Sequence, residues 1–495
     1  MSAPTEPRSP EVPLSAQPHD RLHNADLAPT RPEQRTWTLW SIAALWVGMS
    51  ICIPTYTMAS GLVTQGMNWW QATLTVFLGN VIVLVPLTLN AHPGTAYGIP
   101  FPVLLRSSFG TFGANIPALL RALVACGWFG IQTWVGGAAI YTSSSVLLGF
   151  DPAAKTLLPV LGISSGELLC FLLFWALNML IIWRGMESIK WIEIWSAPFL
   201  IVTGLGLLIW AVIAAKGWGP ILDRPSKFAN AAEFWPVFGA GLTAMVGFWA
   251  TLSLNIPDFS RFARSQRDQV LGQALGLPLT MTFYSFLGIA VTSATVVVFG
   301  EAIWDPVQLV AKFGSPLLSL VALVTFAVAT LSTNLAANVV SPANDFSNLA
   351  PRHISFRAGG LITGVIGILI CPWKLYQDPR GYIFAWLVGY GALLGPIGGI
   401  MIADYFVVRR KRLNVPALYD LAGEYRYTSG FGIPAMTAFV LATIPNIPGF
   451  LVTVRLLSPH LVPDLFGTLY NYAWFVGFAL AFGIYVLLRR AWPKA

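Results

Sequence analysis

The chain has 495 residues, of which 56% are hydrophobic and only 10% are charged, with a formal net charge of +8. A soluble globular domain carries about 25% charged residues, so this chain has too few charges to cover a water-facing surface of its size. The mean hydropathy is +0.67, and many apolar runs reach about 18 residues, the length that a bilayer-spanning helix requires. The composition therefore excludes a soluble protein and predicts an all-α polytopic membrane protein.

The chain begins with a polar segment, residues 1–36, that is rich in proline and charge. It lacks the apolar stretch of a cleavable signal peptide, so we expect a disordered cytoplasmic tail. Twelve apolar segments follow, and each is expected to cross the membrane once. They lie near 38–63, 69–91, 114–148, 165–183, 191–215, 233–257, 273–299, 313–340, 358–373, 382–406, 433–454 and 466–488.

These segments suggest a division of the chain into a transporter-like core and additions. We expect a ten-helix core over 37–408, a cytoplasmic basic loop over 409–432, two further spans over 433–490 and a cytoplasmic C-terminus over 491–495. The segment 91–110, "AHPGTAYGIPFPVLLRSSFG", is too short and too rich in proline and glycine to cross the bilayer. It is predicted to be an interfacial or re-entrant element.

Lysine and arginine are unevenly distributed between the loops. With the N-terminus inside, the predicted outer loops hold 8 of the 29 basic residues, which leaves 21 on the cytoplasmic side, including "RFARSQR" (261–267) and "RRKR" (409–412). This positive-inside bias sets the orientation and accounts for the basic excess without a nucleic-acid partner. We expect the protein in the cell (inner or plasma) membrane, with both termini cytoplasmic.

Two of the predicted spans are interrupted. The first, "LWVGMSICIPTYTMASGL", contains Gly48 and Pro54, and a proline that lacks an amide proton and clashes with the preceding turn should break this helix just before it. Ordinary kinks are the alternative, but two breaks at corresponding positions favour inverted five-helix repeats, in which secondary transporters place substrate and ions. The sixth span has three glycines near its centre, Gly239, Gly241 and Gly247.

Aromatic and amide side chains lie inside two predicted spans. Trp128 and Gln132, in "CGWFGIQTWVGG", are four residues apart and share one helical face, where an indole can stack on a flat ring and a carboxamide can bind its edge. The alternative is a packing tryptophan with the glutamine bonded to a neighbouring helix. Trp249, just after the glycine-rich part of span six, can cover the other face of a flat ligand or serve as a lipid anchor.

The eighth span carries the polar stretch "ATLSTNLAAN" (329–338). Hydroxyl and carbonyl oxygens here, with carbonyls freed at the break of span one, suit a hard cation such as Na⁺. The amide of Asn338 can both donate and accept, as an imide or ureide edge requires. Local hydrogen bonds from hydroxyls to the preceding turn are the alternative. The candidate cation ligands are Gly48, Ile51, Ala329, Ser332 and Thr333.

Charged groups occur at the predicted cytoplasmic helix ends rather than at span centres. A proton carrier at mid-membrane is therefore not evident, and we expect these groups to tie loops or gates together, with proton coupling as the alternative. They are Asp258, Arg261, Asp345 and Asp404.

Enzyme chemistry finds little support in the sequence. No Ser, His and Asp set shares a depth, the five histidines lie on the tail, loops and helix ends, and no cluster has metal-ligand spacing. A channel is disfavoured by the pair of broken helices. Four cysteines fall in or beside apolar runs, as small buried hydrophobes rather than disulfides: Cys52, Cys126, Cys170 and Cys371.

Five motifs in chain order resemble those of the nucleobase–cation symporter family of the first class, whose members carry uracil, cytosine, purines, allantoin and hydantoins. The likeness runs from 25–37 to 420 and weakens toward the C-terminus. The motifs are "GIPFPVLLRSSFG", "GWFGIQTWVGG", "LNIPDFSRF", "STNLAANVVSP" and "LGPIGGIMIADY".

The resemblance implies a LeuT-type fold of ten helices in two inverted repeats, plus two helices. It implies a substrate stacked between Trp128 and Trp249 and bonded at its edge by Gln132 and Asn338. It also implies Na⁺, or H⁺ in some relatives, as the coupling ion, held by backbone oxygens of spans one and eight and two hydroxyls. The matching positions are Gly48, Ile51, Ala329, Ser332 and Thr333.

One position departs from the pattern of the family. Cys52 stands where the hydantoin carrier has a glutamine, and Ile51 with Cys52 replaces the His-Asn pair of allantoin carriers. The pocket therefore offers fewer hydrogen-bonding groups, while "AHPGTAYGIPFP" and "GYGALLGPIGG" look closer to uracil-type carriers. We predict a monomeric cation symporter that imports uracil, with no cofactor, and hydantoin or allantoin transport as the alternative.

Overall fold

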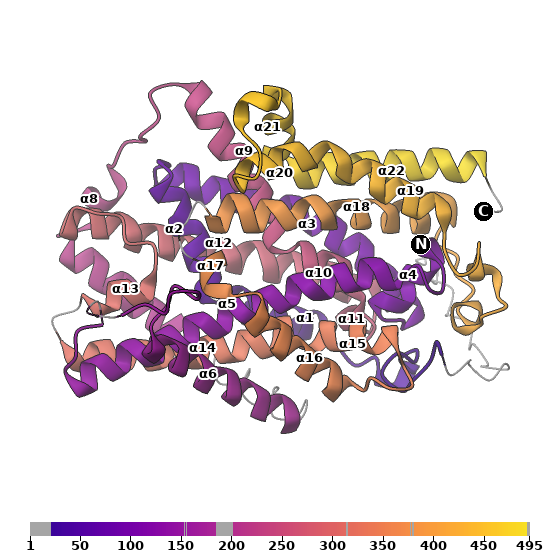
Figure 1. Cartoon of the computed structure of the whole chain (residues 1–495), viewed down its shortest axis with the longest axis horizontal. Coiled ribbons are helices and arrows are strands. Elements are labelled where there is room, and N and C mark those ends of the chain that lie inside the picture. The colour runs from indigo at the N-terminus through magenta and orange to yellow at the C-terminus, as the bar shows by residue number, and fades with distance from the viewer. Residues whose placement is uncertain are drawn as a thin grey trace, which may run out of the picture.

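A computed structural model describes residues 21–152, 154, 156–184, 201–312, 315–376, 378 and 381–492. Within these residues the chain is helical, and extended pairing is limited to isolated bridges. The long helices run roughly along one axis (Figure 1). The loop 409–432 and the last turn of α22 (Ala473–Ala491) lie at one end, here called the terminal end. The opposite end, which carries α8 (Trp218–Leu222) and α13 (Pro306–Ala311), is called the distal end.

The predicted all-helical fold is confirmed and about twelve spans are consistent with it, although residues 191–200 of the fifth predicted span lie outside the described residues. Nine helices among the described residues are long and apolar enough to cross a bilayer, one bent pair forms a tenth span, and two shorter apolar helices complete the set. In chain order the spans are α1 (Leu39–Ser50) with α2 (Ile53–Thr64), α3 (Trp69–Tyr97), α5 (Asn115–Leu148), α6 (Ser165–Arg184), a helix over Ile201–Ala214, α9 (Ala231–Phe248) with α10 (Ala250–Asn255), α12 (Gln266–Phe299), α14 (Pro316–Asn338) with α15 (Val340–Leu349), α16 (Phe356–Leu369), α18 (Val388–Ile402), α19 (Ile433–Thr443) with α20 (Ile447–Thr453), and α22.

Short elements connect these spans. Two of them, η2 and η3, are π-helical turns at the two ends of α18. The connecting elements are η1 (Pro32–Gln34), α4 (Phe101–Phe109), α8, α11 (Pro257–Ser260), α13, α17 (Pro372–Leu375), η2 (Gly381–Leu387), η3 (Ala403–Val408), η4 (Pro416–Tyr419), η5 (Glu424–Arg426), η6 (Ile444–Asn446), η7 (Pro459–Leu461) and α21 (Asp464–Asn471).

Span one breaks where the sequence predicts. The helices α1 and α2 meet at an angle of 58°, with Ile51 and Cys52 between them. Pro54 has no amide proton for the carbonyl of Ser50, four residues earlier, and the amide of Cys52 takes that carbonyl instead at 3.1 Å. Cys52 then no longer donates to Gly48, so the break releases the Gly48 carbonyl from the helical ladder.

Span six is interrupted as well, but at a different place from the one its glycines suggest. The break lies at Trp249, between α9 and α10, whereas Gly239 and Gly241 lie within regular helix. These two glycines give room to neighbours, because a Cβ would lie 2.5 Å from the Tyr472 ring at Gly239 and 2.8 Å from Leu62 at Gly241. Close packing, not helix breaking, explains them.

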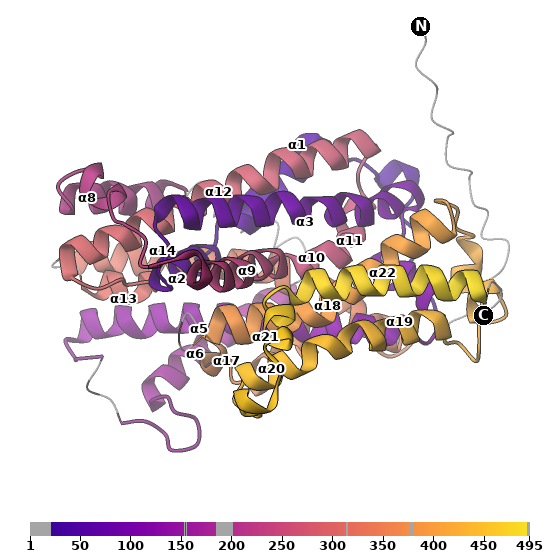
Figure 2. The same ribbon diagram turned by 90° about the horizontal axis from the view of Figure 1, so that it is seen from above.

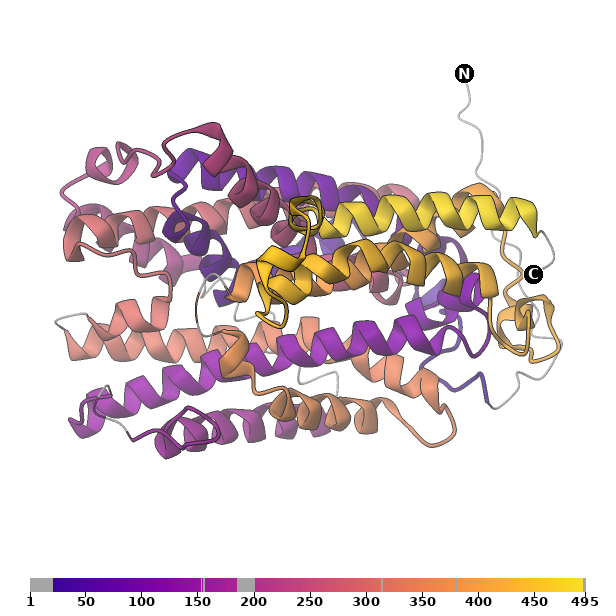
Figure 3. The same cartoon turned by 45° about the horizontal axis from the view of Figure 1, so that its top comes forward.

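The helices form a bundle around the two interrupted spans. Helix α12 packs against α1 and α3, and α14 packs against α5. Figure 2 shows α1, α3 and α12 along one side of the bundle, with the C-terminal α19 and α22 along the opposite side. Helix α22 packs on α18 and α19 and runs along the outside of the molecule (Figure 3). The breaks of both spans thus lie inside, next to α5 and α14.

Two sequence-based expectations need correction. The carbonyl of Leu27, a residue with no exposed surface, accepts a hydrogen bond of 2.6 Å from the Tyr419 hydroxyl. The predicted disorder is therefore wrong for residues 21–36, while residues 1–20 lie outside the described residues. Helix α4, in the segment 91–110, is buried over its whole length, which does not favour the interfacial alternative and leaves the re-entrant one open, and the first part of the segment belongs to α3 (Trp69–Tyr97).

Candidate functional site

A small cavity lies beside the two helix breaks. It leaves about 20 Å³ for the centre of a water-sized sphere, roughly the room that one water molecule needs. Six residues predicted for the site line it: Cys52, Trp128, Gln132, Trp249, Thr333 and Asn338. Five residues that the sequence did not single out also line it: Met49, Phe248, Thr251, Leu252 and Ala337.

Helix α5 contributes an indole and a carboxamide to the cavity. Trp128 donates a hydrogen bond from Nε1 to the Tyr390 hydroxyl at 3.2 Å, which fixes the plane of its ring. Gln132 follows one turn later on the same face, is 3% exposed, and has a buried Oε1 with no partner among the described residues. A buried acceptor without a donor is costly, so this oxygen is available to an N–H group of a ligand.

The second indole is also fixed in place by a hydrogen bond. Trp249 donates from Nε1 to Oδ1 of Asn80 at 2.9 Å, and Asn80 is held in turn by its own bond to the Val76 carbonyl at 2.8 Å. The ring of Phe248 lies with its centroid 5.0 Å from the centroids of both Trp128 and Trp249. A third aromatic ring therefore contacts both indoles that were predicted to enclose the ligand.

Asn338 belongs to a chain of amides that crosses three helices. Its Nδ2 donates to Oδ1 of Asn334 at 3.1 Å, and Nδ2 of Asn334 lies 3.2 Å from both Thr133 Oγ1 and Asn178 Oδ1. These bonds join α14, α5 and α6 and set the orientation of the Asn338 carboxamide. The sequence reasoning passed over Asn334 and Asn178, although both are amides inside apolar spans, which is the signal that would have found them.

Thr333 differs from the threonines that bond locally, and it shares a buried hydroxyl without a partner among the described residues with Thr111, Thr282 and Thr330. The hydroxyls of Thr133 and Thr325 donate to the carbonyl one turn earlier, each at 2.7 Å. Thr333 is 3% exposed, yet its Oγ1 has no hydrogen-bond partner among the described residues. Local bonding, the alternative explanation for these hydroxyls, therefore does not account for Thr333.

The remaining candidate cation ligands lie at the contact of α1 with α14. Ile51 and Ala329 belong to one cluster of packed apolar side chains, and a Cβ built on Gly48 would have no atom within 4 Å. Helix α14 is regular through Ala329. The backbone of Ser332 lies in α14, but its side chain lies outside the described residues.

Between the cavity and the terminal end lies a buried ion pair that the sequence did not predict. Arg121, about 10 Å along α5 from Trp128, contacts Asp345 at 3.3 Å, and neither side chain is exposed. Arg121 also donates to Oδ1 of Asn255 at 2.9 Å, and Asn255 bonds to Ser341. The pair joins α5, α10 and α15 directly below the cavity.

Other charged groups also tie helix ends together. Oδ1 of Asp258 accepts from the amide of Phe101 at 2.9 Å, which anchors α4 to α11. Asp404 accepts from the hydroxyls of Ser107 and Tyr485, each at 2.8 Å, and pairs with Arg409 at 2.8 Å. A tying role for these carboxylates remains a prediction, and the contacts support it.

The described residues contain no group of three or more His, Cys, Asp or Glu side chains that could hold a metal ion. All four cysteines are free, and three are buried, whereas Cys371 is half-buried. Cys52 Sγ lies 3.2 Å from Thr55 Oγ1 in the break of span one.

The sequence profile of a family described as "Permease for cytosine/purines, uracil, thiamine, allantoin" matches residues 29–477. The chain belongs to this permease family. A purine-uracil permease of Arabidopsis thaliana is 46% identical over 96% of this chain and 79% of its own length. The allantoin permease of Bacillus subtilis is 41% identical over 97% of this chain and 96% of its own length.

Solved structures agree with this assignment. Mhp1, described as a nucleobase-cation-symport-1 family transporter and solved in a closed conformation with bromovinylhydantoin bound, aligns with a TM-score of 0.77 at 26% identity, covering 96% of this chain and 97% of its own. A Na⁺-coupled sialic acid symporter shares the fold, with a TM-score of 0.62 at 12% identity. The protein is therefore a multi-pass membrane permease of the predicted fold class and not an enzyme.

Proposed function

We propose that this permease imports uracil, or a planar imide close to it, by symport with Na⁺. The observation that carries the proposal is the cavity at the two helix breaks, where two indoles and two carboxamides converge. The buried Oε1 of Gln132 has no partner in the part of the chain that the structure describes, and the ring N–H groups of uracil are donors for such an acceptor. Indole faces favour a flat ring, because base–aromatic stacking contributes about 1–3 kcal/mol per base.

The relatives narrow the substrate class. The purine-uracil permease covers nearly the whole chain at 46% identity, which supports the pyrimidine. Allantoin is the second candidate because an allantoin permease reaches 41% identity over the same length. Cys52 lines the cavity and is a weak hydrogen-bonding group, which favours uracil over a ureide with more polar groups.

For the coupling ion we propose a site at the contact of α1 with α14. The Thr333 hydroxyl lacks a partner, the Gly48 carbonyl is released by the break, and a carbonyl in a helix such as that of Ala329 keeps a second lone pair. Neutral oxygens of this kind suit Na⁺. An ion that joins α1 to α14 also steadies the wall that carries Asn338, so ion and substrate should strengthen each other's binding, typically by 1–3 kcal/mol.

Substrate entry requires a change of shape. The cavity has the room of about one water, which is too little for a pyrimidine ring. We infer that Phe248 moves away from the two indoles when uracil enters. We further propose that the terminal end faces the cytoplasm, as the positive-inside bias indicates, and that the protein works as a monomer.

The test is uptake of labelled uracil into proteoliposomes containing the full-length protein, with and without an inward Na⁺ gradient. Saturable uptake that needs the gradient is expected. Trp128→Ala should weaken apparent affinity by about 10-fold to 100-fold, from the loss of one stacking face. Trp134→Ala is the matched control, since Trp134 lies on the same helix but contacts Phe171 and Trp373 outside the cavity.

The outcomes separate the parts of the proposal. Uracil uptake that ignores Na⁺ but still depends on Trp128 would refute the ion and retain the substrate. Allantoin uptake without uracil uptake would select the second candidate. Equal affinities of the two tryptophan variants would remove the cavity as the substrate site. Competition by 3-methyluracil as strong as by uracil would show that Gln132 does not accept from that N–H group.

A further inference from the structure

A second and much larger cavity opens at the terminal end, away from the transport site. Its volume is about 820 Å³, within the range of about 300–1,000 Å³ that is usual for ligand pockets. It lies where the last turn of α22 meets η3 and the loop that follows. Five arginines and one carboxylate line it: Arg409, Arg410, Arg412, Arg489, Arg490 and Glu424.

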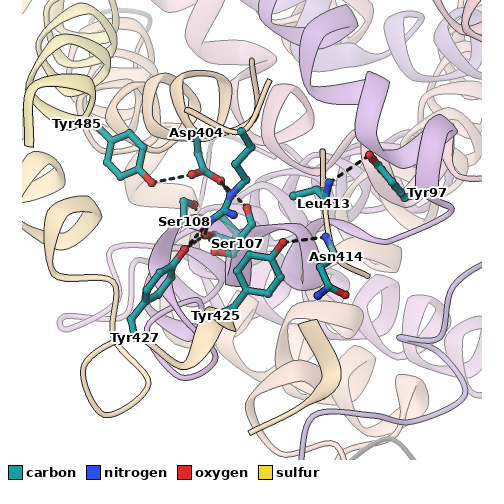
Figure 4. A network of polar contacts seen from close by, with 11 residues as sticks. Tyr97, Ser107, Ser108, Asp404, Leu413, Asn414, Tyr425, Tyr427 and Tyr485 are labelled. Carbon is teal, nitrogen blue, oxygen red and sulfur yellow. Dashed lines mark hydrogen bonds and ion pairs between the residues drawn. The ribbon is translucent and has the colours of Figure 1, made fainter. Parts of the chain in front are cut away.

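The inner part of this arginine cavity is a fixed network. Arg409 pairs with Asp404 at 2.8 Å and donates to the Ser107 carbonyl at 2.6 Å. Its guanidinium lies 4.7 Å from the centroid of the Tyr425 ring. Figure 4 shows this network, in which the hydroxyl of Tyr485 also points at Asp404. Arg409 is thus neutralised and held, and it forms a rigid floor.

The outer arginines present uncompensated charge. Arg410, Arg412 and Arg490 are exposed, and none of the three forms an ion pair with another described residue. Arg410 has a positive φ of 50°, a conformation that favours glycine or asparagine at the end of a helix. Glu424 is the one carboxylate among the lining residues. The cavity therefore carries a net positive charge, and it stays positive when one singly charged anion binds.

The same cavity has an apolar wall. Val407, Val408 and Val486 line it beside the arginines, and the Val407 side chain is 41% exposed. Helix α22 is one of the membrane spans, and Arg489 and Arg490 lie in its last turn. The cavity therefore lies where a predicted membrane span ends.

We propose that the arginine cavity binds the phosphodiester headgroup of an anionic phospholipid, with the start of an acyl chain along the valines. Guanidinium groups bind phosphate oxygens in pairs of parallel hydrogen bonds, and basic pockets between helices at this depth suit such headgroups. A free phosphate could accept the same hydrogen bonds from the arginines, but it has no apolar part that could contact the valines. Neither the permease activity nor the proposed transport site supplies a role for these arginines.

The test uses the purified full-length protein in non-ionic detergent, with phosphatidylglycerol, phosphatidylcholine or inorganic phosphate added separately. Native mass spectrometry counts bound lipid, and thermal unfolding measures stabilisation. We expect retained phosphatidylglycerol and a higher unfolding temperature with it, and neither effect with phosphatidylcholine. The triple variant Arg410→Gln, Arg412→Gln, Arg490→Gln should bind about 100-fold more weakly, which corresponds to about 1 kcal/mol for each arginine.

A matched control removes the same charge from exposed arginines elsewhere, by Arg264→Gln, Arg267→Gln and Arg357→Gln, and should bind like the wild type. Glu424→Gln should bind more tightly and serves as a gain-of-binding variant. Equal losses in the two triple variants would overturn the site, since binding would then follow total charge. Stabilisation by inorganic phosphate equal to that by phosphatidylglycerol would overturn the lipid assignment.

Discussion

Replacing Thr333 by valine removes one hydroxyl group and nearly preserves the shape of the side chain. In the wild type this hydroxyl is buried without a partner among the described residues, and leaving such a group unsatisfied costs about 1–3 kcal/mol. In cation-free solution Thr333→Val should therefore raise the free energy of unfolding by about 1 kcal/mol or more. This sign is unusual, because most core substitutions destabilise.

The matched control is Thr133→Val on the facing helix. The Thr133 hydroxyl donates to the Phe129 carbonyl at 2.7 Å and accepts from Asn334 at 3.2 Å. Its removal loses one bond and leaves an amide donor without that acceptor, so it should destabilise by about 1–2 kcal/mol. The pair of variants thus compares the same chemical change at an unpartnered and a partnered hydroxyl.

The assay is thermal unfolding of purified protein with sodium chloride or with choline chloride at equal ionic strength. Sodium should stabilise the wild type, because an ion that binds only the folded state adds stability in proportion to the logarithm of its concentration. Thr333→Val should lose most of this increment and Thr133→Val should keep it. Two results would refute the reasoning. The first is that Thr333→Val loses as much stability in choline chloride as Thr133→Val does. The second is that sodium stabilises Thr333→Val as much as it stabilises the wild type.

Three further predictions concern Phe248, the ion pair of Arg121 with Asp345, and Asp305. Phe248→Ala should leave the preference between uracil and a bicyclic purine nearly unchanged in competition assays, because this ring moves away from the indoles on binding, and a severalfold gain for the purine would show instead that the ring stays and limits the size of the site. Arg121→Met should lower the free energy of unfolding by about 3–5 kcal/mol, because it leaves Asp345 charged and buried. Adding Asp345→Leu should restore most of the lost stability. Denaturation curves in which the double variant is no more stable than Arg121→Met would contradict this prediction. Burial raises the pKa of Asp305, in the loop before α13, to about 6. The folded state therefore binds this proton more tightly than the unfolded state does, so the free energy of unfolding should fall as pH rises from about 4 to about 6. Asp305→Asn should flatten that dependence while keeping the bond to the Val307 amide, as unfolding temperatures between pH 4 and pH 8 will show.

The spans and the first break could be predicted because each depends on local sequence. Apolar run length predicts a span, and Pro54 cannot donate to the carbonyl of Ser50, so the break follows from one residue. Trp128 and Gln132 reach one cavity because a spacing of four places them on one helical face. The part of the site that helix periodicity determines was therefore accessible without a structure.

The rest depends on partners far apart in the chain. In the sequence, Arg121 looks like a charge at a helix end. It can be buried because it pairs with Asp345, which lies 224 positions later in the chain. The ring of Phe248 lies against both indoles through a side-chain orientation that no spacing reveals. Leu27 lies in a segment whose composition indicates disorder. It is nevertheless packed, because its carbonyl accepts a hydrogen bond from Tyr419, 392 positions away in the chain. Composition and periodicity contain no information about such pairs.

The small size of the empty cavity bears on how tightly transport and gradient are linked. A carrier must return across the membrane without cargo, and a wide, wet passage during that step would let ions leak and waste the gradient. In the described conformation the cavity has about the room of one water, and Phe248 lies against both indoles. Under the proposed mechanism, the ring that moves for the substrate would also restrict the passage of ions when no substrate is bound.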